Sequence, residues 1–412
     1  MTQGRMQTVT QVRDGSSLAH RAALRFAEFA RPFSVVVAIF SAAVLLAMTT
    51  TSSYAKNCSL DDKCTEDLVV VGNNGALFGG SVSTFAPGSA GNNKPLHQII
   101  GHAPGFDGVS GVAISPDLQD IAVGNQLAND ILQFGAGSTG NSAPSAVIIG
   151  PDTGNNNPTG TVFLQGDDED GIFAVANTLG VVIAPDSGIG ICAPVSEGGA
   201  GFSLGTITEF FEGDSGDVIP LNNSPVVLAI PPIPPGVLEN ATIGGCLSFL
   251  GGPTGLASDS TGKLWVVNSL FGYVTSYADD ASGDAFPDNI IGSGVLSATG
   301  GEFVAVDGES DGEIFVTDAG TNTIQVFDTD TFFGTLVATI SGRWLHSPMG
   351  IDSNGDEVYV AINGRNSFLM YDNDFGQLEA GGSPRFNVRV QGGATGLHLP
   401  TGLAVPHPPP VD

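Results

Sequence analysis

The stretch PTGLASDSTGKLWVVNSLFGYVTSYADDASGDAFPDNIIG, residues 253–292, decides the fold. It contains four short apolar runs, and Gly, Asn, Asp and Pro residues separate each run from the next. Runs of this length that are rich in β-branched and aromatic residues and bounded by such turns are typical of antiparallel strands. We therefore predict that this stretch forms one four-stranded sheet.

The same pattern recurs along the chain. Pro-Thr-Gly is also found at 158–160 and 400–402, with variants at 109–111 and 348–350, and Glu302-Phe303-Val304 stands where another is expected. Taking the third residue of each as a marker, the successive intervals are 49, 95, 49, 46 and 52 residues. A second strand then ends in a polar residue at six positions: Asn73, Asn125, Asn177, Asn268, Asp318 and Asn363.

A third element has fixed internal spacing. An aromatic residue is followed six positions later by Gly and then Asn or Asp, and a Pro lies four positions after that Gly. This element begins at Phe85, Phe134, Phe210 and Tyr277. Its presence at Phe210 indicates that residues 158–230 are one unit with an insertion at 178–204. We place a second, Pro-rich insertion at 231–251, before the next unit.

Four strands in about 48 residues is the size of a β-propeller blade. The motif Pro-x-Gly-apolar-Ala-apolar-Asp, followed by a Gly turn and a strand ending in Asn or Asp, resembles NHL repeats, and the resemblance covers residues 67–405. It implies an all-β, six-bladed propeller, with seven blades as the alternative if 178–252 contains a degenerate one. The first unit lacks an inner strand and LPTGLAV (399–405) has no blade after it, so we expect this last strand to complete blade one.

The N-terminal segment indicates export. Residues 1–55 combine a basic leader containing five Arg, a 16-residue apolar run at 33–48 and a small-x-Ala sequence at 53–55. The alternative is an uncleaved N-terminal membrane anchor, although about 20 apolar residues are needed to span a bilayer. Both place the propeller outside the cytoplasm, as a secreted, periplasmic or cell-surface protein. A short Cys-containing lead-in (56–66) precedes the propeller, and a Pro-rich tail (406–412) follows it.

Charge and cysteine content narrow the function classes. The net charge of −29 disfavours nucleic acid and anionic lipid as partners, so we expect no membrane contact beyond the N-terminal segment. The four cysteines favour disulfides Cys58–Cys64 and Cys192–Cys246 in an oxidising compartment. The second pairing follows from the fold, because second-to-third strand and blade-to-blade connections share one face. Buried thiols are the alternative for Cys192 and Cys246.

Two candidate sites lie at the predicted pore mouth. The six strand-end residues are typical of side chains that bond to backbone at turns, and alternatively they form a polar ring for a cation or sugar. Glu302 replaces the Thr, Ser or Met found elsewhere at the start of an inner strand, so it is a candidate Ca²⁺ ligand. Calcium is the one cofactor that the sequence suggests.

The sequence favours binding over catalysis. Similarity to peptide-amidating lyase propellers would imply zinc-binding His in the inner-strand motif, but those positions hold Thr, Ser, Met and Phe. Similarity to gluconolactonase-type propellers would imply a metal-binding Glu, for which Glu302 is the one comparable residue. We predict a non-enzymatic module that binds a protein or carbohydrate ligand. The alternative is a Ca²⁺-dependent hydrolase or lyase with its site at the pore mouth.

Overall fold

The computed structural model describes most of the chain beyond residue 67. The described residues are 68–75, 77–165, 171–182, 203–223, 226–228, 237–239, 241–245, 247–297, 300–307, 312–373 and 385–407. The predicted export segment, the lead-in and all four cysteines (Cys58, Cys64, Cys192 and Cys246) lie outside these residues. Within them, no helix has the length and apolar character needed to cross a membrane.

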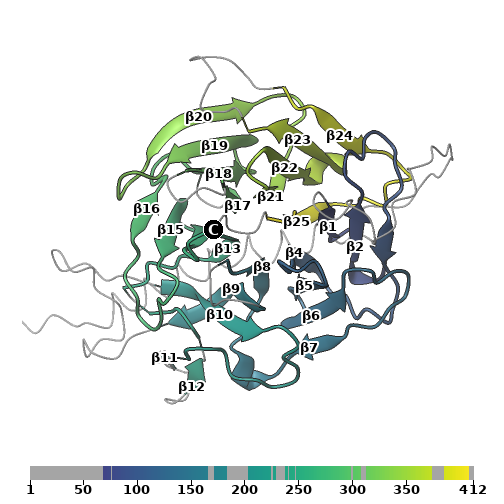
Figure 1. Ribbon diagram of the computed structural model, residues 1–412. Helices are drawn as coiled ribbons and strands as arrows, with labels where there is room; N and C mark the ends of the chain where they lie inside the picture. The colour runs from purple at the N-terminus through teal and green to yellow at the C-terminus, as the bar shows by residue number, and fades with distance from the viewer. Residues whose placement is uncertain are drawn as a thin grey trace, which may run out of the picture. The chain divides into compact units, whose positions relative to one another are not determined.

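Six antiparallel sheets surround a central axis, which confirms the predicted six-bladed all-β propeller (Figure 1). Each complete blade has four strands, which follow one another from the inside outwards. Blade 1 is β25 (Pro400–Ala404), β1 (Val69–Asn73), β2 (Ser81–Phe85) and β3 (His97–Ile99); blade 2 is β4 (Val109–Ile114), β5 (Asp120–Asn125), β6 (Asp130–Gly135) and β7 (Ala146–Ile148).

The second half of the ring repeats this order. Blade 4 is β13 (Pro253–Ser258), β14 (Leu264–Asn268), β15 (Tyr273–Tyr277) and β16 (Asn289–Ile291); blade 5 is β17 (Gly301–Val306), β18 (Glu313–Asp318), β19 (Thr323–Asp328) and β20 (Thr335–Ser341); blade 6 is β21 (Pro348–Ser353), β22 (Glu357–Ile362), β23 (Ser367–Asp372) and β24 (Val388–Gln391). Short 3-10 turns are η1 (Leu77–Gly79), η2 (Pro151–Thr153) and η4 (Asn363–Arg365).

Blade 3 departs from this order. Its sheet contains β8 (Pro158–Phe163), β9 (Ile172–Val182) and β10 (Ser203–Phe211), and Ile243 occupies the outer position through an antiparallel bridge to Ile207. A separate hairpin, β11 (Val226–Leu228) with β12 (Val237–Glu239), precedes this outer segment. The predicted placement of the Pro-rich insertion before the next unit is therefore wrong, because the insertion lies inside blade 3.

The ring closes as predicted. β25 pairs antiparallel with β1, with Val71 opposite Leu403 and Val70 opposite Ala404, so the last described strand completes the first blade. Beyond β25, the Val405 amide donates to Asp352 Oδ2 (2.8 Å), and His407 Nε2 lies 3.4 Å from Asp352 Oδ1. Burial lowers the pKa of His407, but the neighbouring Asp352 carboxylate more than offsets this and holds that pKa above its ordinary value. These contacts tie the end of the closing strand to blade 6.

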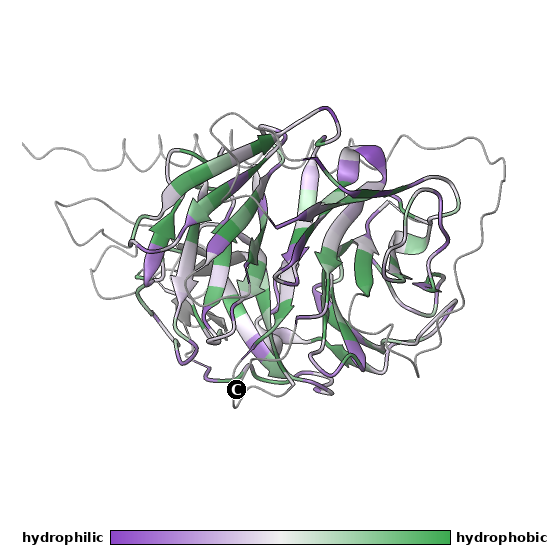
Figure 2. Ribbon diagram, turned by 45° about the horizontal axis from the view of Figure 1, so that its top comes forward, coloured by the Kyte–Doolittle hydropathy of each residue, from purple (hydrophilic) through white to green (hydrophobic). Residues whose placement is uncertain are grey.

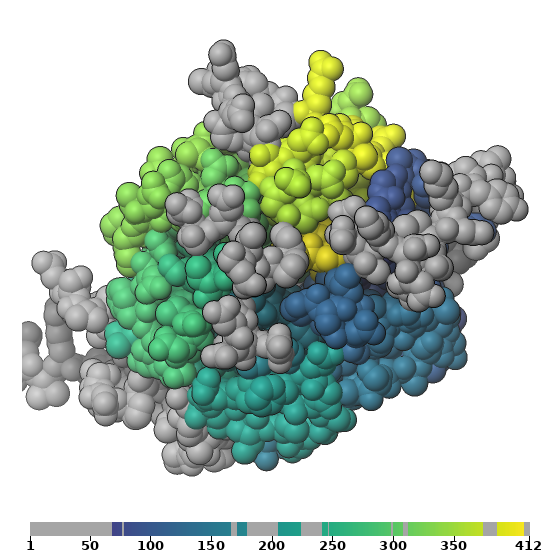
Figure 3. All heavy atoms as spheres, viewed as in Figure 1, coloured from purple at the N-terminus to yellow at the C-terminus, as the bar shows by residue number. Residues whose placement is uncertain are grey.

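The hydrophobic core lies between the blades. Six buried clusters each draw side chains from two adjacent blades. Because successive residues of a strand face opposite sides, Val70 faces blade 2 while Val69 and Val71 face blade 6. Strands buried on both sides need apolar residues facing each side. Figure 2 shows green, hydrophobic segments in many of the strands, and Figure 3 shows consecutive blades in contact around the ring.

The marker glycines allow the inner strands to approach one another closely. A Cβ on Gly111 would lie 2.4 Å from Thr159 O, and one on Gly160 would lie 2.4 Å from Thr254 O, both in the next blade. Gly255, Gly350 and Gly402 meet equally close backbone. In blade 5, Gly301 pairs with Asp318 as Pro253 pairs with Asn268 in blade 4. The marker glycine of blade 4, Gly255, therefore corresponds to Phe303 in blade 5. The predicted marker at Val304 is therefore one residue too late.

The Gly-Asn/Asp element of the third-strand motif joins each of the first four blades to the blade before it in the ring. Its Gly forms a parallel bridge to the preceding outer strand, in the pairs Gly91–Val390, Gly140–Ile99, Gly216–Ile148 and Gly283–Ile243. Its side chain accepts a backbone N–H from the segment after that strand, in the pairs Ala394–Asn92 (2.8 Å), Ala103–Asn141 (2.8 Å), Asp152–Asp217 (2.7 Å) and Leu247–Asp284 (2.5 Å). We call this element the blade clamp.

Candidate functional site

Five of the six strand-end residues are fully buried and hold the backbone of their own blade. These are Asn73, Asn125, Asn177, Asn268 and Asp318. Each accepts a backbone N–H from the segment that leads into the inner strand: His398 to Asn73 (3.1 Å), Asp107 to Asn125 (2.5 Å), Asn156 to Asn177 (3.0 Å), Gly251 to Asn268 (2.7 Å) and Ser297 to Asp318 (2.9 Å). Binding a ligand with these atoms would require breaking those bonds.

The amide groups of the asparagines are also used within the blades. Asn268 Nδ2 donates to Val266 O (3.2 Å) and to Thr275 Oγ1 (2.9 Å). Asn177 Nδ2 donates to Thr208 Oγ1 (3.0 Å) in the same way. The arrangement matches the structural reading of the repeated polar residue, in which a short side chain satisfies nearby backbone groups.

Blade 6 is the exception. Ile362, rather than Asn363, pairs with the first residue of its inner strand, Pro348. Asn363 begins η4 and donates through Nδ2 to Pro400 O of blade 1 (3.3 Å). The segment entering this inner strand is held instead by Asn322 of blade 5, which accepts the Ser347 N–H (2.6 Å). The predicted set therefore contains five equivalent positions and one neighbouring residue with a different contact.

Glu302 occupies the second position of β17. Equivalent residues in the other inner strands are Ser110, Thr159, Thr254, Met349 and Thr401. Two of the threonines bond to the next blade, Thr159 Oγ1 to Pro253 O (3.1 Å) and Thr401 Oγ1 to Ser110 O (3.1 Å). Among the described residues, no hydrogen bond or ion pair is found for the Glu302 carboxyl group.

The surroundings of Glu302 disfavour its charged form. Burial, with a further contribution from the negative charge of Asp318, raises the pKa of Glu302 to about 8. Perturbed carboxyl groups of this kind occur at functional sites and in structural cores alike. Among the described residues, no group of three or more His, Cys, Asp and Glu side chains is arranged to hold a metal ion. The calcium role of Glu302 stays a prediction.

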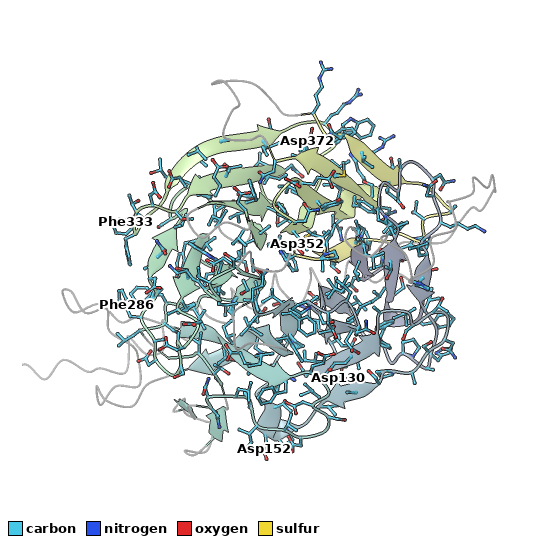
Figure 4. All side chains as sticks on the ribbon, viewed as in Figure 1. Asp130, Asp152, Phe286, Phe333, Asp352 and Asp372 are labelled. Atoms are coloured by element: carbon cyan, nitrogen blue, oxygen red, sulfur yellow. The ribbon has the colours of Figure 1, made fainter. Side chains whose placement is uncertain are left out.

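A row of aromatic rings lies on the outer edge of blades 4 and 5 and beside the outer segment of blade 3. Phe249 contacts Phe286 edge-on (5.5 Å between ring centroids), Phe286 stacks with Phe332 (6.3 Å), and Phe332 meets Phe333 edge-on (4.9 Å). Phe286 is 56% exposed and Phe333 69%. Figure 4 shows both on the same outer side of the ring, near β16. We call these four residues the aromatic rim.

The aromatic rim is held in place by strand-borne contacts. Phe249 has a left-handed backbone (φ 57°), which is rare for a bulky residue, and its carbonyl accepts a hydrogen bond from the Tyr273 hydroxyl (2.6 Å). The Phe332 carbonyl accepts the Ile290 N–H (2.9 Å), joining blades 4 and 5, where the blade clamp of the first four blades has no counterpart among the described residues. No spacing in the sequence indicates this surface, because Phe249, Phe286 and the adjacent Phe332 and Phe333 come from three separate segments of the chain.

Comparisons with known proteins identify the fold. No known family model matches the sequence, and no curated protein matches it. A chain in the crystal structure of a nidogen/laminin complex superposes with a TM-score of 0.50 at 12% identity, covering 82% of this chain and 97% of that one. A protein of unknown function from Bacteroides caccae gives 0.46 at 9% identity, with coverage of 83% and 99%. The similarity to the chain of the nidogen/laminin complex agrees with the β-propeller fold, while the NHL-repeat assignment stays a prediction.

Proposed function

We propose that this protein is an exported, non-enzymatic propeller of the NHL-repeat type that binds a protein partner through the aromatic rim. The partner would carry an apolar patch bordered by basic residues. One observation carries the proposal: four phenylalanine rings in continuous contact, two of them more than half exposed, lie on one side of the ring.

Several features of the aromatic rim favour a protein partner. Exposed aromatic groups fixed in one geometry are typical of residues that dominate protein–protein binding energy. Further exposed apolar side chains lie close in sequence, with Leu247 next to the outer segment of blade 3 and Leu336 and Val337 on β20. Among the outer strands of the four-stranded blades, β20 is the longest, at seven residues, and it contains no charged residue.

The charges around the aromatic rim indicate the character of the partner. Asp284 and Asp288 flank Phe286, and Asp330 precedes Phe332 by two residues; all three are exposed. An apolar centre with an acidic border is complementary to an apolar patch with a basic border. The same charges would repel another acidic surface, so a second copy of this chain is a poor candidate.

Site-specific photo-crosslinking tests this proposal. A photoreactive phenylalanine analogue at position 333, in the natural host, is expected to give one discrete adduct, identified by mass spectrometry. The matched control is the same analogue at Ile149, which follows the outer strand of blade 2 and is 47% exposed. Phe286→Asp should abolish the adduct from position 333. The same adduct from both positions, or none from position 333, would contradict the proposal.

The Glu302 carboxyl group has no hydrogen bond among the described residues and lies near the charge of Asp318, and a bound cation would compensate both; this favours a second candidate function, a Ca²⁺-dependent hydrolase or lyase acting at the pore mouth. Turnover of a lactone, phosphoester or peptide that requires Ca²⁺ and is lost in Glu302→Gln would favour this function over binding. A thermal unfolding midpoint that Ca²⁺ raises in the wild type but not in Glu302→Gln would support the metal site.

A further inference from the structure

Three arginines surround one tryptophan on blade 6. The guanidinium carbons of Arg343, Arg365 and Arg389 lie 4.9, 5.2 and 4.2 Å from the ring centroid of Trp344. The distance between any two of these guanidinium carbons is at most the sum of their distances to the ring centroid, about 10 Å. Phe386 meets Trp344 edge-on at 6.2 Å. We call Trp344 and its three arginines the arginine cluster.

The arginine cluster assembles from segments that are distant in the chain. Arg343 and Trp344 follow β20 in the connection from blade 5 to blade 6, Arg365 ends η4, and Arg389 lies in the outer strand β24. Figure 4 shows nitrogen-tipped side chains at the outer edge of blade 6, close to the labelled Asp372. The members are therefore carried by an inter-blade connection, a 3-10 turn and an outer strand.

The cluster holds three of the six Lys and Arg residues found beyond residue 63. Beyond residue 63 the chain has two Lys, Lys94 and Lys263, and four Arg, at positions 343, 365, 385 and 389, while the whole chain has 42 acidic residues. Long-range attraction alone would draw carboxylates to these arginines. Instead, the ion pairs found among the described residues are Lys263–Asp288 and His407–Asp352.

Among the described residues, no carboxylate forms an ion pair with these arginines. Arg365 donates to the Arg343 carbonyl (2.6 Å), and its buried Nε has no hydrogen-bond partner. Asp372, on the adjacent strand β23, accepts a hydrogen bond from Asn387 instead. Like charges held together, with a buried N–H left unsatisfied, are unfavourable unless another group completes the arrangement.

We propose that the arginine cluster binds a compact oxyanion, a carboxylate, sulfate or phosphate group carried by a small ligand. Guanidinium groups present paired N–H donors in a fixed plane that matches such oxyanions, and stacking on Trp344 orients those planes before the ligand arrives. The net charge of −29 repels extended polyanions, which favours a small ligand over a nucleic acid or a charged polymer. The site is separate from the aromatic rim.

Titration of the full chain with sulfate, phosphate and succinate, at constant ionic strength, tests the proposal. Binding is followed by calorimetry and by tryptophan fluorescence, since Trp344 is partly exposed while the second tryptophan, Trp265, is buried. We expect saturable binding that Arg389→Ala and Arg343→Ala each weaken about tenfold or more. Preference for succinate identifies a carboxylate ligand, and preference for the other two identifies a tetrahedral oxyanion.

Control variants separate the site from general charge effects. Lys94→Ala removes an exposed cation outside the cluster and is expected to change binding by less than about twofold. Arg389→Lys keeps the charge but not the planar donors, so binding should weaken several-fold. Thermal unfolding verifies that each variant is folded. Absence of saturable binding by all three anions, or equal weakening by Lys94→Ala, would overturn the proposal.

Discussion

At the scale of single residues, Glu302 carries a carboxyl group with no hydrogen bond or ion pair among the described residues. Five inner strands have Ser, Thr or Met at this position, and the sixth has a carboxyl group beside Asp318. Burial raises the pKa of Glu302 to about 8, so the folded protein retains a proton at neutral pH that the unfolded chain has released. Raising the pH into the neutral and alkaline range therefore lowers the free energy of unfolding through this one residue.

The variant Glu302→Gln tests this effect. Below the ordinary pKa of 4.5 the two proteins should be similarly stable, and the variant should gain over the wild type as pH rises towards 8. Each pKa unit corresponds to about 1.4 kcal/mol, so the gain above pH 8 is at most a few kcal/mol. Denaturant unfolding at pH 5 and pH 8.5 measures it, with Asp280→Asn as an exposed control. A difference that is constant with pH would refute the assigned pKa.

At the scale of elements, the blade clamp explains why the motif combines Gly with Asn or Asp. Its side chain packs on a glycine after the preceding outer strand: a Cβ on Gly101 would lie 2.2 Å from Asn141 Oδ1, and one on Gly392 would lie 2.2 Å from Asn92 Oδ1. The spacing of this motif was visible in the sequence as a turn. Its role between blades was not, because the two partners belong to different repeats.

A double-mutant cycle on the blade clamp is expected to show coupling. Gly101→Ala should destabilise the fold by about 1–3 kcal/mol through its positive φ and the contact with Asn141, and Asn141→Ala by about 1 kcal/mol. The double variant should lose less than the sum, since truncating Asn141 relieves the contact. The control Gly105→Ala also has positive φ but open space around it, and it should be additive with Asn141→Ala. Additivity in both pairs would rule out the clamp contact.

The sequence predicted the repeat more accurately than the exceptions to it. Blade number and ring closure follow from spacing, because each blade obeys the same local rules. Phe303 at a glycine position, and an insertion inside blade 3, break those rules, so their placement depended on strand pairing that only the structure shows. Arg343, Arg365 and Arg389 meet at Trp344 from three separate segments, which no spacing in the sequence indicates.

At the scale of the whole molecule, stability depends on the closing strand. Leu403, Ala404 and Val405 are buried, and Thr401 Oγ1 donates to Val109 O of blade 2 (3.0 Å). Without β25, β1 would become an exposed edge and blade 1 would separate from blades 2 and 6. The closing strand therefore contributes to two blade interfaces as well as to its own sheet.

Truncation after residue 398 is expected to lower the thermal unfolding midpoint sharply, because burial of each large apolar side chain contributes about 2 kcal/mol to the free energy of unfolding. Truncation after residue 407 retains β25 and the His407–Asp352 contact, and it serves as the matched control. A synthetic peptide of residues 399–407, added to the shorter chain, should restore part of the lost stability. Equal midpoints for the two truncations would show that closure contributes little.

Closure also has a consequence for biosynthesis. Thr401 donates to Gly72 O across 329 positions of sequence, so the strand that completes blade 1 leaves the ribosome after every other described strand. A polypeptide interrupted anywhere before residue 400 retains an open β1, which is the kind of unpaired edge that proteases and chaperones engage. The fold thus distinguishes a chain that contains β25 from one interrupted before it.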